Sequence, residues 1–149
     1  MMSDAKGTIE LIKARLVIEV GAAGLAAENA SSDQIESLSR LTDELSNTLV
    51  DQSPDRYIEK NIAFHSLVAE FSNNRFIIYS FENIKEYISQ YMHEFFKSMP
   101  GLFSSSVEFH RNIFQGIAEK KPDKARQAMT EHIETIHKNY LQYMEKIQP

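Results

Sequence analysis

Apolar residues recur at the spacing of an α-helix along nearly the whole chain, and this repeat constrains the fold more than any other feature of the sequence. No segment shows the alternating apolar and polar residues of a half-buried β-strand. Five glycines and four prolines among 149 residues also leave few sites for the tight turns of β-structure. The sequence therefore predicts an all-α protein.

Capping residues and helix breaks divide this repeat into six predicted helices joined by short loops. Ser31 and Gln34 have the spacing of a capping box, Ser53 and Pro54 mark an N-cap and a first helical position, and Asn74 can cap another helix. Because short loops place consecutive helices antiparallel, we expect a compact antiparallel helical bundle. The predicted helices cover residues 4–29, 33–50, 54–71, 75–98, 104–119 and 124–146, with a turn at residues 121–123.

Composition and charge exclude several classes of function. The chain has no cysteine, which rules out disulfides, cysteine-based zinc sites and thiol catalysis. No stretch reaches the roughly 20 apolar residues that span a bilayer, and the first residues lack the apolar run of a signal peptide. The net charge is −5 and the basic residues are scattered, so we expect a cytoplasmic chain that neither enters a membrane nor binds nucleic acid by itself.

Three histidines interrupt the apolar helical stripes. His65 follows Asn61 by one turn in the third predicted helix, and His110 and His132 take core positions in the fifth and sixth. A buried polar group without a partner costs about 1–3 kcal/mol, so three of them in one core require an explanation. A shared metal ion is one explanation, because imidazole binds Zn, Ni, Cu and Fe, and bundles hold metals between facing helices. Hydrogen bonding inside the core is the other.

The order and spacing of these residues resemble the FCD domain, the effector-binding domain of the FadR branch of GntR transcription regulators. The first helix is similar in having Arg15 and Glu19 four residues apart, followed by a run of small residues. The segment NIAFH at residues 61–65 resembles the family's motif of Asp or Asn, two variable residues, Phe and His. His110 and His132, in two further motifs, are 22 residues apart, as in the family.

The resemblance implies a single FCD-like domain over residues 1–149, without the N-terminal winged-helix DNA-binding domain of a complete regulator. Metal-binding members hold a divalent cation with an Asp or Asn and three His, which implies Asn61, His65, His110 and His132 as ligands here. Zn or Ni is the expected ion, and Fe or Mn also suits such ligands. Asn61 stands where many members have Asp, which implies weaker metal binding and a stronger attraction for an anionic ligand.

The resemblance also implies a small organic acid as effector and a homodimer, with DNA bound only through the winged-helix domain that this chain lacks. Arg15 is expected either to face the pocket, where a guanidinium can bind a carboxylate through two hydrogen bonds, or to form a surface pair with Glu19. Tyr91 and Tyr87 are expected either to line the same pocket or to pack in the core.

Three functions follow from these alternatives. A metal-assisted sensor of a small carboxylate is the leading hypothesis, and we expect no enzymatic activity. A metal-dependent hydrolase is an alternative because three His and an open position can activate water, but Glu59, Glu108 and Glu131 lie off the stripes, which leaves no evident general base. A metal-free helical dimerisation module, with its histidines hydrogen-bonded in the core, is the third.

Overall fold

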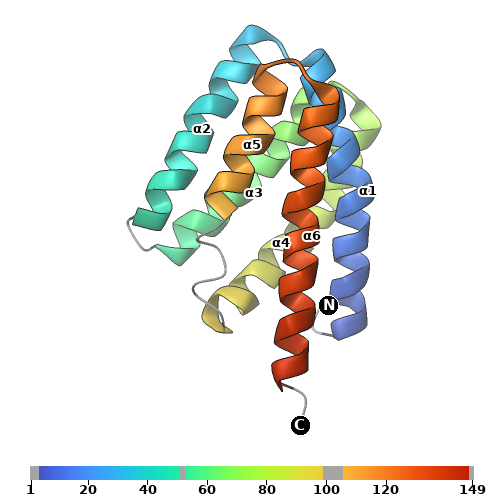
Figure 1. Cartoon of the computed structure of the whole chain (residues 1–149), viewed down its shortest axis with the longest axis vertical. Coiled ribbons are helices and arrows are strands. Elements are labelled where there is room, and N and C mark those ends of the chain that lie inside the picture. Colours follow the sequence, from blue (N-terminus) through green and yellow to red (C-terminus); the bar gives the residue numbers. More distant parts are fainter. Residues whose placement is uncertain (1–3, 51–52, 99–105, 148–149) are drawn as a thin grey trace.

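A computed structural model describes residues 4–50, 53–98 and 106–147, and all its regular structure is helical (Figure 1). No β-strand is present among these residues, which confirms the predicted all-α class. None of the described helices combines the length and the apolar character needed to cross a membrane. The helices are α1 (Ala5–Asn29), α2 (Ser32–Val50), α3 (Pro54–Phe71), α4 (Arg75–Ser98), α5 (Ser106–Ala118) and α6 (Pro122–Ile147).

Helix α1 is the element on which the bundle is centred. It packs against α3, α4, α5 and α6, and its most extensive contact is with α6. Figure 1 shows α1 and α6 side by side, with the first turn of α1 and the last turn of α6 at the same end of the molecule. Helix α5 packs against α6 and α2, while α3 packs against α4 and α2. Side chains from α1, α3, α5 and α6 can therefore meet in one interior.

The predicted capping residues begin the helices where the sequence placed them. The backbone N–H of Gln34 donates to Ser31 Oγ, and the backbone N–H of Ser31 donates to Gln34 Oε1, which confirms the capping box. Asn74 Oδ1 accepts two backbone N–H groups from the first turn of α4. Ser53 differs, because it precedes Pro54 as expected but its side chain makes no capping hydrogen bond.

The predicted turn at residues 121–123 is wrong in its position. Helix α6 already begins at Pro122, because proline fits the first position of a helix, where no backbone N–H is required. The chain instead reverses at Lys120, whose φ of 57° is in the left-handed region. The predicted start of the fifth helix at residue 104 lies outside the described residues.

Small residues let α6 approach α1 and α5 closely, and we call this contact the small-residue seam. A Cβ atom added to Gly116 of α5 would lie 2.6 Å from the backbone nitrogen of Ala125 in α6, so only glycine fits there without a shift. A Cβ atom on Gly24 of α1 would lie 2.9 Å from Cγ of Arg126. The small-residue part of α1 therefore packs closely against α6. Its alanines on this side, each 0% exposed, are Ala22, Ala23, Ala26 and Ala27.

Candidate metal and effector site

Three helices each place one histidine in the interior beside α1. His65 of α3, His110 of α5 and His132 of α6 are 1%, 1% and 3% exposed. One nitrogen from each ring can be chosen so that all three atoms lie within 4.8 Å of one another. The structure thus brings together the three histidines that interrupt the apolar stripes. Among the residues that the structure describes, they form the group whose ligand atoms suit a metal ion.

The two nearest ring nitrogens have the separation of two ligands on one ion. His65 Nε2 lies 3.3 Å from His110 Nε2. Two nitrogens that bind a tetrahedral Zn²⁺ at ~2.0–2.1 Å lie ~3.3–3.4 Å apart. Asn61 Nδ2 lies 3.1 Å from the same His110 nitrogen, and because an amide NH₂ only donates, His110 Nε2 directs a lone pair toward this space. Both ring nitrogens therefore fit a shared cation.

His132 supplies the third ring, and one of its nitrogens makes no hydrogen bond with a described residue. Its Nε2 is buried and makes no hydrogen bond with any residue that the structure describes. The ring stacks on that of His65 at 5.3 Å between centroids and meets the ring of His110 edge-on at 4.8 Å. A buried polar atom left without a partner costs about 1–3 kcal/mol, which a bound divalent cation would offset. The donor set of this site thus fits such an ion.

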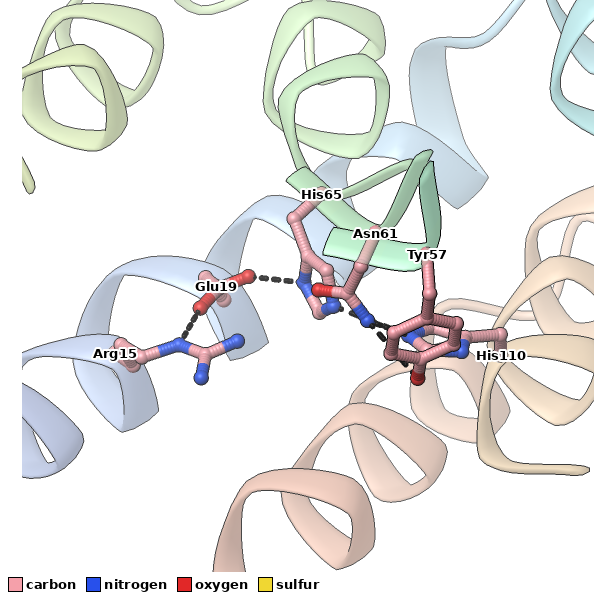
Figure 2. Close-up of polar contacts among 6 residues, drawn as sticks. All are labelled: Arg15, Glu19, Tyr57, Asn61, His65 and His110. Atoms are coloured by element: carbon pink, nitrogen blue, oxygen red, sulfur yellow. Dashed lines mark hydrogen bonds and ion pairs between the residues drawn. The ribbon is translucent and has the colours of Figure 1, made fainter. Parts of the chain in front are cut away.

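In Figure 2 the amide nitrogen of Asn61, and not its oxygen, is directed toward His110. Asn61 Nδ2 also lies 3.4 Å from the hydroxyl of Tyr57, which in turn contacts Ser106 Oγ. A half-turn of the amide exchanges oxygen and nitrogen at nearly the same positions. Asn61 can therefore ligate a metal only after this rotation, and then through a neutral oxygen. Three ligand positions are formed in the structure, and the fourth depends on that rotation.

Glu19 is a site residue that the sequence analysis did not assign. It is 1% exposed, and one of its carboxylate oxygens contacts His65 Nδ1 (Figure 2). Its other oxygen accepts a hydrogen bond from Arg15 Nε at 2.5 Å. A signal was present in the sequence, because Arg15 and Glu19 continue the buried face of α1 that contains Ile12 and Ala22. The pair that the spacing indicated is thus real, but it lies in the interior.

Burial favours neutral rings at His110 and His132, close to an ionised Glu19. Burial alone would raise the pKa of Glu19, but the charges and hydrogen bonds of Arg15 and His65 outweigh burial and lower that pKa to about 2. Burial holds the pKa of His110 well below its usual range, with a further contribution from His65. Burial and then the neighbouring His110 do the same to the pKa of His132. A neutral imidazole is the form that binds a metal.

A pocket with a cavity volume of about 30 Å³ is lined by His132 and Asn61. Arg15 is part of its wall, and because Nε is the atom that donates to Glu19 (Figure 2), the two terminal guanidinium nitrogens are not used in that hydrogen bond. Tyr91 also lines it, with a buried hydroxyl that makes no hydrogen bond to a described residue. Tyr87 is 41% exposed and is not part of the wall, so the structure does not bring it to the site. The wall consists of Arg15, Tyr57, Asn61, Tyr91, Met92, Ser106, Phe109, His132, Thr135, Ile136 and Asn139.

The described residues offer no carboxylate suited to act as a general base at this site. Glu59, Glu108 and Glu131, the acids considered for that role, are all exposed. Glu19 is the buried acid among the described residues, but both its oxygens are engaged and its pKa is about 2, which makes it a weak base. The geometry therefore suits binding better than hydrolysis.

Comparison with known sequences assigns the family. The FCD domain profile matches residues 10–135. The uncharacterized HTH-type transcriptional regulator YcbG of Bacillus subtilis is 24% identical over 137 residues, which cover 91% of this chain and 55% of that protein. The putative L-lactate dehydrogenase operon regulatory protein of Escherichia coli is 24% identical over 140 residues, covering 92% of this chain and 53% of that protein. The chain thus spans about half the length of these curated relatives.

Solved structures agree with this assignment. Streptococcus agalactiae GntR has a TM-score of 0.72 and 28% identity, over 87% of this chain and 57% of its own. Escherichia coli McbR/YncC has a TM-score of 0.83 over 94% of this chain and 70% of its own, and at 17% identity it supports the fold alone. The sequence relatives are transcriptional regulators and not enzymes, as expected. With a family profile that matches most of its length, the chain belongs to the FCD-domain family of GntR-type transcription regulators.

Proposed function

We propose that this chain senses a small organic acid at a divalent metal ion held by His65, His110 and His132. Asn61 would complete the ligand set after its amide rotates. The observation that carries the proposal is the convergence of three buried imidazoles, two of them with Nε2 atoms 3.3 Å apart. The bound ion would supply positive charge that attracts a carboxylate oxygen. Ligands rich in imidazole favour Zn or Ni, while Fe or Mn also suits them.

Charge balance favours an anionic effector. The three imidazoles and the Asn61 amide are neutral ligands, so they leave the charge of a divalent cation uncompensated. Glu19 does not offset it, because its charge is already matched by Arg15. The terminal nitrogens of Arg15 and the hydroxyl of Tyr91 are the pocket's donors for a carboxylate. An organic acid would therefore meet positive charge and hydrogen-bond donors in the same space.

The size of the pocket favours a short acid. A cavity of about 30 Å³ holds roughly two water molecules, since each needs about 10–15 Å³. A larger molecule would have to displace side chains of the wall, of which Met92 is the most adaptable. The name of the Escherichia coli relative concerns an L-lactate dehydrogenase operon, which makes L-lactate a suitable first probe.

At the level of the whole regulator, we place this domain in a cytoplasmic homodimer. The sequence relatives are about twice as long as the region they share with this chain. DNA would be bound by a winged-helix domain outside this chain, and effector binding would act by stabilising one of two dimer geometries over the other.

Metal content of the purified, untagged protein is the first test. We expect close to one equivalent of a divalent metal in the wild type and in His93→Ala, because His93 is exposed and belongs neither to the histidine cluster nor to the pocket wall. His132→Ala should lose most of it. If the wild type holds no metal, and retains none after loading with Zn²⁺ or Ni²⁺ and desalting, the metal site is refuted. The histidines would then serve a metal-free core or pocket.

The effector is tested separately by thermal melts of the metal-loaded protein against short organic acids, beginning with L-lactate. We expect at least one acid to raise the melting temperature of the wild type and to have little effect on Arg15→Gln. A panel without any stabilising acid would refute the carboxylate assignment and leave the metal site intact.

A further inference from the structure

Both ring nitrogens of His65 are engaged, and they differ in what they face. Nδ1 contacts a carboxylate oxygen of Glu19, while Nε2 faces His110 Nε2 at 3.3 Å (Figure 2). A carboxylate only accepts hydrogen bonds, so the Glu19 contact requires the proton of a neutral His65 ring to be on Nδ1. Nε2 then directs its lone pair to the space that the three histidines share.

Glu19 is held in its ionised form by a second partner. Arg15 donates from Nε to the other carboxylate oxygen at 2.5 Å, and both side chains are almost fully buried, at 4% and 2% exposure. A buried carboxylate loses the hydration that stabilises its charge, and it tolerates burial only when its oxygens are paired. The side chains thus form a chain from Arg15 through Glu19 to His65.

Stability of the bundle alone does not account for this chain of polar contacts. Replacing a buried ion pair by apolar residues of similar volume is often neutral or stabilising. The buried face of α1 is apolar on either side of the pair, with Ile12 before it and Ala22 after it. Apolar residues would continue that face without an unpaired charge. The contact with His65 therefore points to a role in the site.

We propose that Glu19 is a positioning residue of the metal site, which fixes the Nδ1–H tautomer of His65 and so presents Nε2 to the ion. This inference rests on the metal site in the proposed function. Histidines that bind metals usually donate their other ring N–H to a carboxylate, a carbonyl or water, and loss of that partner lowers metal affinity by about 10–100-fold. Arg15 acts indirectly, by keeping Glu19 charged within the interior.

Zn²⁺ affinity, measured by competition with a chromophoric chelator, tests the inference. We expect Glu19→Gln to bind Zn²⁺ about 10–100-fold more weakly than the wild type. Glu10→Gln is the matched control, because Glu10 is on the same helix but exposed, and it should bind like the wild type. Equal affinity of Glu19→Gln and wild type would overturn this inference and leave the proposed function standing. A wild type that binds no Zn²⁺ would overturn both.

A second measurement on the wild type covers the case in which Glu19→Gln does not fold. Long-range ¹H–¹⁵N NMR spectra distinguish the two neutral tautomers of each histidine ring. We expect metal-free His65 to carry its proton on Nδ1, and Zn²⁺ to perturb Nε2. The opposite tautomer, or Zn²⁺ bound through Nδ1, would overturn the role of Glu19 while leaving a metal site in place.

Discussion

Helices α1, α5 and α6 meet in two buried regions that are built in opposite ways. In the small-residue seam, Gly24 and Gly116 bring backbones and side chains within van der Waals contact, and no ligand is required. A turn or two along the same helices, where α3 also packs against α1, the interior becomes polar. This polar core consists of Arg15, Glu19, Asn61, His65, His110 and His132, each 4% exposed or less.

The seam and the polar core contribute differently to the stability of the folded protein. Close packing in the seam gains dispersion and removes apolar surface from water in the protein alone. The polar core contains a nitrogen of His132 with no partner among the described residues and a Tyr91 hydroxyl in the same condition. Such groups reduce the stability of the free protein and can be satisfied by a ligand. We therefore expect the seam to determine folding and the polar core to determine the response to ligands.

Neighbouring residues of α6 provide the sharpest test of this division. Ile133 is 0% exposed in the apolar core, and Ile133→Ala should lower the free energy of unfolding by about 2–5 kcal/mol, because it leaves a cavity. His132→Leu replaces the unpartnered ring by an apolar side chain and should change that free energy little, or raise it, in metal-free protein. Urea unfolding with chelator present measures both. A loss in His132→Leu as large as in Ile133→Ala would mean that the polar core is part of the folding scaffold.

Metal addition should narrow the difference in stability between the two variants. At a free Zn²⁺ concentration of about 100 times its dissociation constant, binding stabilises the folded state by about 2.7 kcal/mol. We expect this gain in the wild type and in Ile133→Ala, whose histidines are intact. His132→Leu should show almost none of it. Thermal melts with and without Zn²⁺ measure the gain, and an equal gain in all three proteins would place the metal elsewhere.

The seam is tested by adding a single methyl group. Gly116→Ala places Cβ against the backbone of Ala125 and should cost about 1–3 kcal/mol of unfolding free energy, with Zn²⁺ affinity unchanged. Gly21→Ala is the control, because nothing lies within 4 Å of its Cβ position. It should stabilise α1 by about 0.5–1 kcal/mol, since alanine favours helix more than glycine does. Denaturant unfolding that ranks the two variants the other way would contradict the seam.

The sequence predicted the fold because its signals are local. The capping box at Ser31 and the helical repeat each need only a few neighbouring residues to act. The three histidines were also predictable, since a polar residue on an apolar stripe must face the core. That His65, His110 and His132 meet could be inferred only from the family resemblance, because the packing of helices decides it.

The positions of the remaining site residues could not be predicted from a local sequence pattern, because they depend on how the helices pack. Arg15 and Glu19 have the same spacing in a surface pair and in a buried one, and only the packing of α1 against α3 distinguishes the two. Tyr87 and Tyr91 are one turn apart on α4, yet Tyr91 lines the pocket and Tyr87 is exposed. Which of them reaches the interior depends on how α4 lies against its neighbours.

The two regions should also differ in how their contribution to stability depends on pH, because the polar core contains groups that titrate and the seam does not. The pKa values of His110 and His132 are held well below 6.5 in the folded state by burial, whereas the unfolded chain takes up protons near 6.5. The unfolded state therefore binds more protons as the pH falls below about 6.5, and stability decreases. Glu19, with a folded pKa of about 2 and an ordinary value of 4.5, contributes a further loss only below about pH 4.5. The small-residue seam contains no group that titrates between about pH 4.5 and pH 6.5.

Metal-free protein should accordingly lose stability between about pH 6.5 and 5, and the two histidines should account for most of the loss. At about pH 5.5, one unit below the unfolded value, each contributes on the order of 1 kcal/mol. His132→Leu removes one of these groups, so its free energy of unfolding should fall by about half as much as that of the wild type. Gly116→Ala should lose the same amount as the wild type over this pH range, but from a lower starting stability. Urea unfolding at a series of pH values measures these slopes. Identical slopes in His132→Leu and wild type would show that His132 takes up its proton in the folded protein, which would remove it from the set of neutral ligands.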